Sequence, residues 1–405
     1  MNVWVVKVGE QLPIKTNIRK LRALQLCEAL AEQGHKVTWW TSAFNHFQKD
    51  WFFNEDTVLT PSENFTVQAI RGIGYHRNFS LRRLVDHRIL SHRFALMIPK
   101  AELPDVIVIA IPAYDVAYRF AQFAVANGIP YIIDARDKWP DSFVDTNMPS
   151  LRLLGRLCLV YERYMTRYSI RNAAGHVAMS RNMASWLEGY LDKKRISGTA
   201  VIPLGFSRPA ECRDPSPAVK KLFDRIYGKK IVTFVGTFGK YHDPTVMIEA
   251  AEKMGDDKAA FVIVGDGEMA SELHLRAKDV SGTHFTGWLD MDDIDYVLTR
   301  SHVGVCSTGI TAEREFFPNK VFLYLSYGLS VASMFAGELR DLIDDKSLGF
   351  NFQTSDQLVS GLSGLFEDQN RLEKQSLAST KLFRQKFDSR ELMRQYCDIV
   401  LSACQ

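Results

Sequence analysis

The sequence predicts an α/β protein built of two Rossmann-like domains, each with a parallel sheet. Apolar runs of strand length alternate with amphipathic runs of helix length from end to end, which is typical of parallel sheets. The 405 residues are enough for two domains with separate cores. Three prolines and mixed charge between Phe206 and Lys221 indicate a linker, and the same alternation restarts after it. We therefore expect one domain over residues 1–205, a second over 206–386 and a last helix over 387–405.

The first domain is expected to begin with a strand and then to alternate strand and helix. Asn17–Gln33 has apolar residues at helical spacing and is followed by Gly34, a common helix stop. A second helix is expected over Val116–Ala126, between two apolar strands. The expected strands are Trp4–Val8, Val37–Thr41, Asp105–Ala110, Pro130–Asp134, Val177–Ser180 and Ala200–Pro203.

The second domain repeats this order. In such sheets the ligand binds beyond the carboxyl ends of the strands, so the residues just after each strand are the first candidates for a site. The expected strands are Ile231–Gly236, Ala260–Gly265, Val303–Cys306 and Ser330–Met334, and the expected helices are Pro244–Met254, Met269–Lys278, one after Pro318, and Glu391–Ala403.

Composition excludes several classes of protein. The net charge of +3 is too small to indicate a nucleic-acid-binding protein, and no RNA- or DNA-binding motif is visible. No run reaches the ~20 apolar residues of a transmembrane helix, and the first nine residues indicate a strand rather than a signal peptide. The six cysteines are scattered without metal-ligand spacing, which is typical of reduced thiols. These features favour a cytoplasmic protein.

Pro318, Asn319 and Lys320 open a short apolar helix that stops at Gly328. Proline fixes φ for a first helical turn. The N–H groups at a helix start attract anions, here a diphosphate, and Lys320 would add a point charge. Glu315, just ahead, would accept hydrogen bonds from sugar hydroxyls. The alternative is an ordinary proline-started helix.

A glycine turn, from Gly236 and Thr237 to Lys240, ends the first strand of the second domain. Glycine lets a backbone approach a ligand closely with its N–H groups pointing outward, and Lys240 is a cation available to a diphosphate. The alternative is a plain turn from strand to helix.

A second glycine turn, Gly265-Asp266-Gly267, follows the next strand. A dinucleotide-binding dehydrogenase would need Gly-x-Gly-x-x-Gly after its first strand. No such motif occurs in this turn or near Gly9.

The most unusual polar cluster runs from Asp134 to Asp141 and includes Arg136, Asp137 and Trp139. It directly follows an apolar strand, so its charges should emerge at the carboxyl edge of the sheet, where ligands bind. The alternative is a charged surface turn in which Arg136 pairs with Asp134 or Asp141.

Together these segments resemble the retaining nucleotide-sugar glycosyltransferases of family four, which have two Rossmann-like domains in the GT-B fold. The resemblance rests on Pro-Asn-Lys after Glu315, on Gly-Asp-Gly, and on the Arg-Asp-x-Trp-Pro sequence of bacterial polysaccharide enzymes. It covers almost the whole chain. Two positions depart from the family: Leu323 stands where a second acid usually binds the ribose, and Thr237 replaces an arginine.

The resemblance implies roles for the candidate residues. It places Glu315, Arg136 and Asp137 at the reacting sugar, and it implies no metal or other cofactor. It also implies that the last helix packs back on the first domain. The implied donor diphosphate contacts are Gly236, Thr237, Lys240, Asn319 and Lys320, the nucleotide contacts are Gly265, Asp266 and Gly267, and the acceptor-side residues are Asn17 and Arg19.

The function implied is a retaining glycosyltransferase of bacterial surface polysaccharide synthesis, such as that of O-antigen or capsule. It would move a sugar from a nucleoside diphosphate to a glycan or to a glycan linked to polyprenyl diphosphate. Two alternatives stay open: a nucleotide-sugar epimerase on the same fold, and an inactive partner subunit, which the departures at Leu323 and Thr237 make conceivable.

The stretch from Arg71 to Phe94 is basic, with interleaved apolar residues and Asp86 as its one acid. Such a stretch can bind an anionic surface at the inner face of the cytoplasmic membrane. The alternative is a helix docked on the first domain with its arginines in solvent.

Overall fold

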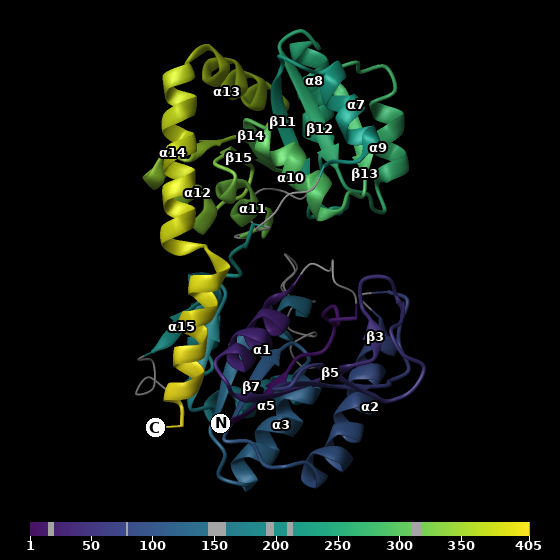
Figure 1. The fold of residues 1–405 in the computed structure, drawn as a ribbon, viewed down its shortest axis with the longest axis vertical. Coiled ribbons are helices and arrows are strands. Elements are labelled where there is room, and N and C mark those ends of the chain that lie inside the picture. Colours follow the sequence, from purple (N-terminus) through teal and green to yellow (C-terminus); the bar gives the residue numbers. More distant parts are fainter. Residues whose placement is uncertain are drawn as a thin grey trace. The chain divides into compact units, whose positions relative to one another are not determined.

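A computed structural model describes residues 1–14, 20–77, 80–144, 159–191, 198–208, 214–309 and 317–404. The chain forms two compact units, which we name the N-terminal unit and the C-terminal unit (Figure 1). The predicted α/β class with two parallel-sheet domains is confirmed. The N-terminal unit comprises Met1–Pro203 with Glu391–Gln405, and the C-terminal unit comprises Leu204–Arg390.

The N-terminal unit contains an eight-stranded sheet in the order β10-β9-β8-β7-β1-β2-β6-β5. All neighbours are parallel except β5, which runs antiparallel to β6 at the edge. A separate two-stranded ribbon, β3-β4, follows β2. The strands are β1 (Asn2–Val6), β2 (Lys36–Ser42), β3 (Phe44–Asn45), β4 (Asp50–Trp51), β5 (Thr57–Ser62), β6 (Phe65–Ile70), β7 (Val106–Ile111), β8 (Tyr131–Ala135), β9 (Gly175–Ala178) and β10 (Thr199–Val201).

Helices cover this sheet. The last helix, α15, belongs to the N-terminal unit from Glu391 onward, and its Leu392, Met393 and Tyr396 join the apolar cluster around β1 and α1. Two short 3₁₀ turns lie at Ile98–Lys100 and Asp141–Val144. The helices are α1 (Arg22–Glu32), α2 (Leu81–Met97), α3 (Tyr114–Ala126), α5 (Val160–Arg171), α6 (Arg181–Glu188) and α15 (Ser389–Ser402).

The alternation of side chains along β1 explains why this sheet is covered on both faces. Trp4 and Val6 enter one apolar cluster, whereas Val3 and Val5 enter the other. Successive side chains of a strand point to opposite faces, so a continuous apolar run of this kind suits a central parallel strand.

The C-terminal unit contains a six-stranded, wholly parallel sheet in the order β13-β12-β11-β14-β15-β16. Its strands are β11 (Lys230–Val235), β12 (Ala259–Val264), β13 (Thr283–Gly287), β14 (Val303–Cys306), β15 (Ser330–Ser333) and β16 (Gly349–Asn351). Its helices are α7 (Pro217–Arg225), α8 (Thr245–Met254), α9 (Ala270–Arg276), α10 (Met291–Thr299), α11 (Lys320–Ser326), α12 (Glu338–Lys346), α13 (Ser355–Glu367) and α14 (Gln369–Lys386).

The expected linker is shorter than its prolines indicate. Pro217 opens α7 rather than extending a loop, because proline suits the first turn of a helix, where its missing N–H costs nothing. Of the expected linker, residues 209–213 lie outside the described residues. Within the described parts of the chain, no helix is long and apolar enough to span a bilayer.

Candidate functional site

The C-terminal sheet has its switch point between β11 and β14. The chain runs outward from β11 through β12 to β13 and then returns to β14 on the other side of β11. The loops that leave these two central strands therefore diverge, which opens a crevice at their carboxyl ends. Gly236 follows β11, and α11, which begins at Lys320, follows β14. Two segments expected to bind the donor diphosphate thus lie at this one point.

Tyr324 fixes α11 on the sheet. A Cβ atom on Gly304 would come within 2.3 Å of the Tyr324 ring, so glycine is needed for this close approach. The Tyr324 hydroxyl accepts a hydrogen bond from Val235 N at 3.0 Å and donates one to Val305 O at 3.2 Å. Lys320 lies one helical turn before Tyr324 and shares its face of α11, so it too points toward the end of β11.

Lys320 is buried with its ammonium beside Gly236. Only 8% of the residue is exposed, and Nζ lies 3.3 Å from the centroid of the Phe234 ring. A Cβ atom on Gly236 would be 3.1 Å from Nζ. Nζ has no hydrogen-bond partner among the residues that the structure describes. Burial lowers the pKa of Lys320 to about 7, whereas the Cys306 thiol acts in the opposite direction. Burial of an ammonium without a counter-charge destabilises the folded protein, and a bound anion would offset that loss of stability.

The helix expected after Pro318 is present but has only seven residues. Asn319 is its N-cap, and the Asn319 side chain is exposed and makes no capping hydrogen bond. So short a helix contributes little dipole, because the macrodipole arises from many aligned peptide units. We infer that Lys320, rather than the helix start, supplies most of the positive charge here.

The two glycine turns expected near the donor lie against each other. Phe238 N donates a hydrogen bond to Asp266 O at 2.9 Å. A Cβ atom on Gly265 would come within 1.9 Å of Gly236 O, and one on Gly267 within 2.2 Å of Phe238 O. These glycines are therefore required by the packing of one turn on the other, whichever ligand the turns bind.

The remaining donor-side candidates are at the surface of these turns. The side chains of Thr237, Lys240 and Asp266 are exposed. Lys240 O accepts a hydrogen bond from Gly309 N at 2.9 Å, which joins the loop after β14 to the first turn. Leu323, where the resemblance would place an acid, packs against the apolar cluster of α11. Contacts of these residues with a donor stay predictions.

Arg136 belongs to a buried ionic network rather than to an open surface. Its Nε lies 2.8 Å from Asp134, and its guanidinium also pairs with Glu10. Arg22 pairs with the same oxygen of Asp134 at 3.1 Å and lies over the ring of Tyr396 at 4.6 Å. Although burial acts against the ionised form, Arg22 and Arg136 hold the pKa of Asp134 below its usual range.

This network changes the interpretation of the Asp134–Asp141 cluster. The pairing of Arg136 with Asp134, stated as the alternative, is present, but the pair is buried and not in solvent. Arg136 therefore holds the loop after β8 in place. The fully buried partners were not foreseen, because Glu10 and Arg22 lie far from Arg136 in the sequence.

Asp137 differs from Arg136, because it is only partly buried and stays a candidate for contact with a sugar. It accepts a hydrogen bond from Lys138 N at 2.8 Å. Burial raises its pKa, whereas that hydrogen bond and the charges of Lys7 and Arg83 lower it.

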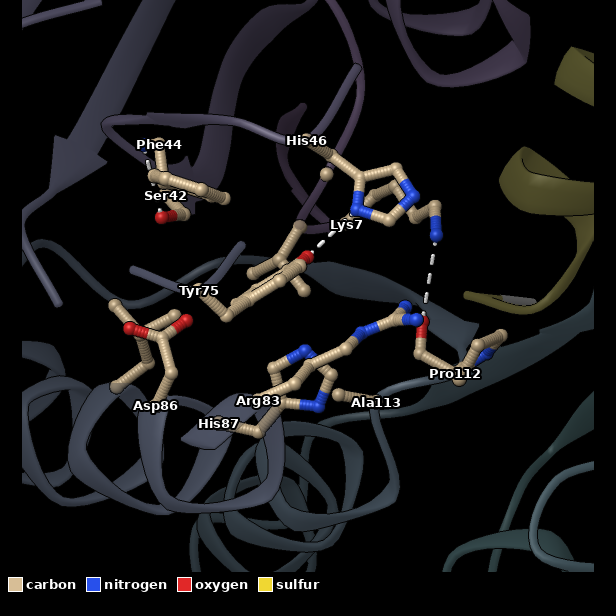
Figure 2. Close-up of a pocket in the computed structure, with 13 residues that line it drawn as sticks. Lys7, Ser42, Phe44, His46, Tyr75, Arg83, Asp86, His87, Pro112 and Ala113 are labelled. Atoms are coloured by element: carbon tan, nitrogen blue, oxygen red, sulfur yellow. Dashed lines mark hydrogen bonds between the residues drawn. The ribbon is translucent and has the colours of Figure 1, made fainter. Parts of the chain in front are cut away.

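A cationic pocket in the N-terminal unit was not predicted from the sequence (Figure 2). Lys7 follows β1, and its Nζ donates a hydrogen bond to Pro112 O at 3.4 Å. The His46 ring and the Tyr75 hydroxyl share a hydrogen bond of 2.6 Å. Arg83 of α2 also lines the pocket. The one sequence signal for this pocket is Lys7 itself, a charge within the apolar run that opens the chain.

Three candidates, Asn17, Arg19 and Glu315, lie outside the described residues. The structure does place the basic stretch: α2 is docked on the N-terminal unit, as the alternative supposed, but its arginines mostly contact the protein rather than solvent. The contacts are Arg82 with the carbonyls of Gly74 and Ile73, Arg88 with Asp115 and Glu162, and Arg93 with Asp56.

The acidic run at Asp290–Asp293 contains a helix cap. Asp290 Oδ1 accepts a hydrogen bond from Asp293 N at 2.9 Å at the start of α10. Among the described residues, no cluster of three or more His, Cys, Asp or Glu side chains is arranged to hold a metal ion.

Two family models match the chain. The model described as "Glycosyl transferase 4-like domain" matches residues 20–205, and the model described as "Glycosyl transferases group 1" matches residues 229–368. No curated protein sequence matches the chain at a significant level.

Several solved structures share the architecture over almost the full length. Anabaena Alr3699/HepE in complex with UDP is 16% identical, with a TM-score of 0.69 and 99% of each chain covered. Sucrose-phosphate synthase from Thermosynechococcus elongatus is 13% identical, with a TM-score of 0.71 and 98% of each chain covered. WaaG, a glycosyltransferase involved in lipopolysaccharide biosynthesis, is 11% identical, with a TM-score of 0.62 and 99% of each chain covered. At these identities the likeness shows a common fold.

Proposed function

We propose a specific reaction for this chain, which is a glycosyltransferase with the GT-B fold and domains of the family-four-like type. It moves a sugar from a nucleoside-diphosphate sugar to a hydroxyl of a glycan or lipid-linked glycan and retains the anomeric configuration. The observation that carries the proposal is the buried ammonium of Lys320, beside Gly236 at the switch point of the C-terminal sheet. Solved structures of the same fold hold UDP or UDP-glucose, which supports a donor of that class.

Charge on the departing diphosphate is what this site would stabilise. Lys320 lies within a low-dielectric environment, where a fixed charge acts more strongly than in water. Lys240 lies on the exposed turn beside it and would meet an outer phosphate oxygen. Positioned cations aimed at developing charge are a main source of rate enhancement in group transfer. Glu315 would hold the donor sugar, and Asp137 would orient it.

Retention follows if the leaving phosphate itself takes the proton of the acceptor hydroxyl. That route requires neither an enzyme nucleophile nor a metal ion, and the two lysines would carry the charge on the diphosphate. We propose this metal-independent route for the chain.

The setting we propose is surface polysaccharide synthesis, such as that of O-antigen or capsule, at the inner face of the cytoplasmic membrane. The WaaG likeness and the Arg-Asp-x-Trp-Pro sequence support this setting. Because most arginines of α2 contact the protein, the membrane contact would fall on its exposed apolar residues, of which Leu81 is 80% and Val85 47% exposed.

Radiolabelled nucleotide-sugars, offered with and without a polyprenyl-diphosphate-linked saccharide, test the reaction. We expect label in the lipid fraction only when the acceptor is present, and NMR of the product should show the anomeric configuration of the donor. Conversion of the nucleotide-sugar to its epimer without acceptor would support an epimerase instead. No turnover of any donor would contradict the proposal.

Liposome flotation tests the membrane contact separately. We expect wild type to float with anionic vesicles and Leu81→Ser/Val85→Ser to float less. Leu275→Ser, on α9 of the C-terminal unit and 73% exposed in wild type, is the matched control. Equal flotation of all three proteins would rule out this face of α2 as the contact.

A further inference from the structure

The N-terminal sheet has a switch point of its own, and the cationic pocket lies at it. From β1 the chain continues to β2, then to β5 at the edge of the sheet and back to β6, and it then returns to β7 on the other side of β1. Lys7 follows β1, and Pro112 follows β7, so both belong to the loops that diverge there. The cavity that they line has a volume of about 70 Å³. That is room for several waters, or for a group of about five heavy atoms.

Two fixed cations define the pocket. Figure 2 shows the Lys7 ammonium and the Arg83 guanidinium on the same side of the cavity, near Pro112. The Arg83 guanidinium is held over two aromatic rings, 4.4 Å from the centroid of Trp139 and 5.3 Å from that of Tyr75. Stacking of this kind restricts the guanidinium without neutralising it.

The acidic side chain that lines the pocket is already engaged. Asp86 Oδ1 accepts hydrogen bonds from Ile73 N at 2.7 Å and Gly74 N at 2.9 Å, which secures the loop before α2. Among the described residues that line the pocket, Asp86 is the only carboxylate, so its single negative charge faces two cations. The pocket is therefore suited to a ligand that brings its own negative charge.

The histidines of the pocket are buried and lie near its cations. Burial, followed by the charges of Lys49, Arg83 and Lys7, lowers the pKa of His46 to about 3. Burial, followed by the charges of Arg83 and Lys7, places the pKa of His87 well below its usual range. Both rings are therefore neutral near pH 7 and add no positive charge to the pocket.

We propose that this pocket binds a phosphate group carried by the acceptor, so that the acceptor is a phosphorylated glycan rather than a neutral one. The inference rests on the proposed function and adds the chemical class of the acceptor. A phosphate has the size of the cavity and several oxygens, which the planar fork of Arg83 and the point charge of Lys7 would share. The phosphate comes either from a polyprenyl diphosphate or from an ester on a soluble sugar.

Binding of inorganic phosphate tests the pocket itself. Phosphate is titrated by calorimetry into the full-length protein saturated with UDP, which keeps the donor side occupied. We expect the affinity to fall at least tenfold in Lys7→Met and in Arg83→Gln. The controls are Lys36→Met, whose lysine pairs with Glu102 at the surface, and Arg88→Gln on the same helix; both should bind phosphate as wild type does. Equal affinity in wild type and both pocket variants would overturn the proposal.

Transfer assays test the acceptor class. The same saccharide is offered as its polyprenyl diphosphate, as its soluble 1-phosphate and as the free sugar. We expect kcat/KM to be at least tenfold lower for the free sugar, and we expect Arg83→Gln to raise the KM of the phosphorylated acceptor without changing UDP affinity. Which of the two phosphorylated forms is used identifies the source of the phosphate.

The two proposals fail in different ways. Equal transfer to all three acceptors would refute the phosphate pocket and leave the proposed glycosyl transfer intact. Phosphate binding that both pocket variants abolish, with no transfer to any acceptor, would support the pocket and refute the proposed reaction.

Discussion

Replacement of Lys320 by methionine should make the protein more stable while it weakens nucleoside-diphosphate binding. Methionine is similar in length and apolar, so it can occupy the same space over the Phe234 ring. The variant removes a buried charge that has no hydrogen-bond partner among the described residues. A purely structural lysine would give the opposite result, because its loss would cost stability.

The magnitude follows from the pKa of Lys320, which burial lowers from 10.5 to about 7. One pKa unit corresponds to about 1.4 kcal/mol, so the shift sets an upper bound of about 5 kcal/mol on the free energy that the charged form costs the fold. Allowing for relaxation and water in the open site, we expect Lys320→Met to gain about 2 kcal/mol at pH 7, which raises Tm by roughly 4–8 °C in a domain of this size.

The difference in stability between wild type and Lys320→Met should depend on pH. Between pH 7 and pH 10.5 the unfolded state of wild type binds more protons at Lys320 than the folded state does, so this group makes the wild type more stable as pH rises. The advantage of Lys320→Met should therefore be full below pH 7 and should shrink toward zero by about pH 10.5.

Thermal unfolding checks the stability change, with wild type and Lys320→Met compared at pH 7 and pH 10. Calorimetry of UDP and uridine binding to both proteins checks the loss of affinity. We expect UDP to lose more affinity than uridine, because Lys320 is proposed to meet phosphate. Lys253→Met, whose lysine forms a surface pair with Asp356, controls for loss of a positive charge. A destabilised Lys320→Met, or equal losses for UDP and uridine, would refute the reasoning.

Four further results are expected. Glu315→Ala should lower transfer at least tenfold with an unchanged circular dichroism spectrum, since a lost hydrogen bond to a charged group costs about 1.5–3 kcal/mol; transfer at the wild-type rate would remove Glu315 from the site. Transfer should persist in EDTA, and activity that vanishes there and returns with Mg²⁺ would contradict the metal-free route. Gly265→Ala should lower Tm and UDP affinity, because its Cβ would lie 1.9 Å from a carbonyl oxygen of the neighbouring turn. Gly364→Ala, inside helix α13 with nothing within 4 Å of its Cβ, should not lower Tm, because alanine favours a helix, and should leave UDP affinity unchanged. Arg22→Met should cost about 3 kcal/mol in urea unfolding, because it deprives the buried Asp134 of one cationic partner; an unchanged midpoint would show that the pair contributes nothing.

Much of the fold could be predicted from local patterns. The central strands are continuous apolar runs, and Pro318 fixes the start of α11 within two residues. The edge strand β5 and its neighbour β6 were missed; β5 is largely exposed and lacks an apolar run. Strands of this kind are defined by their neighbours in the sheet more than by their own composition.

Residues of the candidate site could be predicted only where the informative residues lie close together in one segment of the sequence. Lys320 could be singled out beside Pro318, since both belong to one helix start. The cationic pocket combines Lys7 with Arg83, which come together only because α2 packs on the face of the sheet that contains β1. The separation of Lys7 and Arg83 in the sequence does not show that they are close in space, so the pocket could be found only from the structure.

The course of α15 also bears on the order in which the protein folds during synthesis. Its Tyr396 packs against Arg22, near the other end of the chain, and both belong to the N-terminal unit. Domains generally fold as they leave the ribosome, beginning with the first to emerge. Here the first unit to emerge stays without part of its core until α15 is translated, and the residues of the C-terminal unit, Leu204–Arg390, all precede Glu391. The C-terminal unit is therefore the one whose sequence can be completed and folded first. A ribosome stalled before residue 391 would display an unfinished N-terminal unit with one apolar surface open, a natural target for a chaperone.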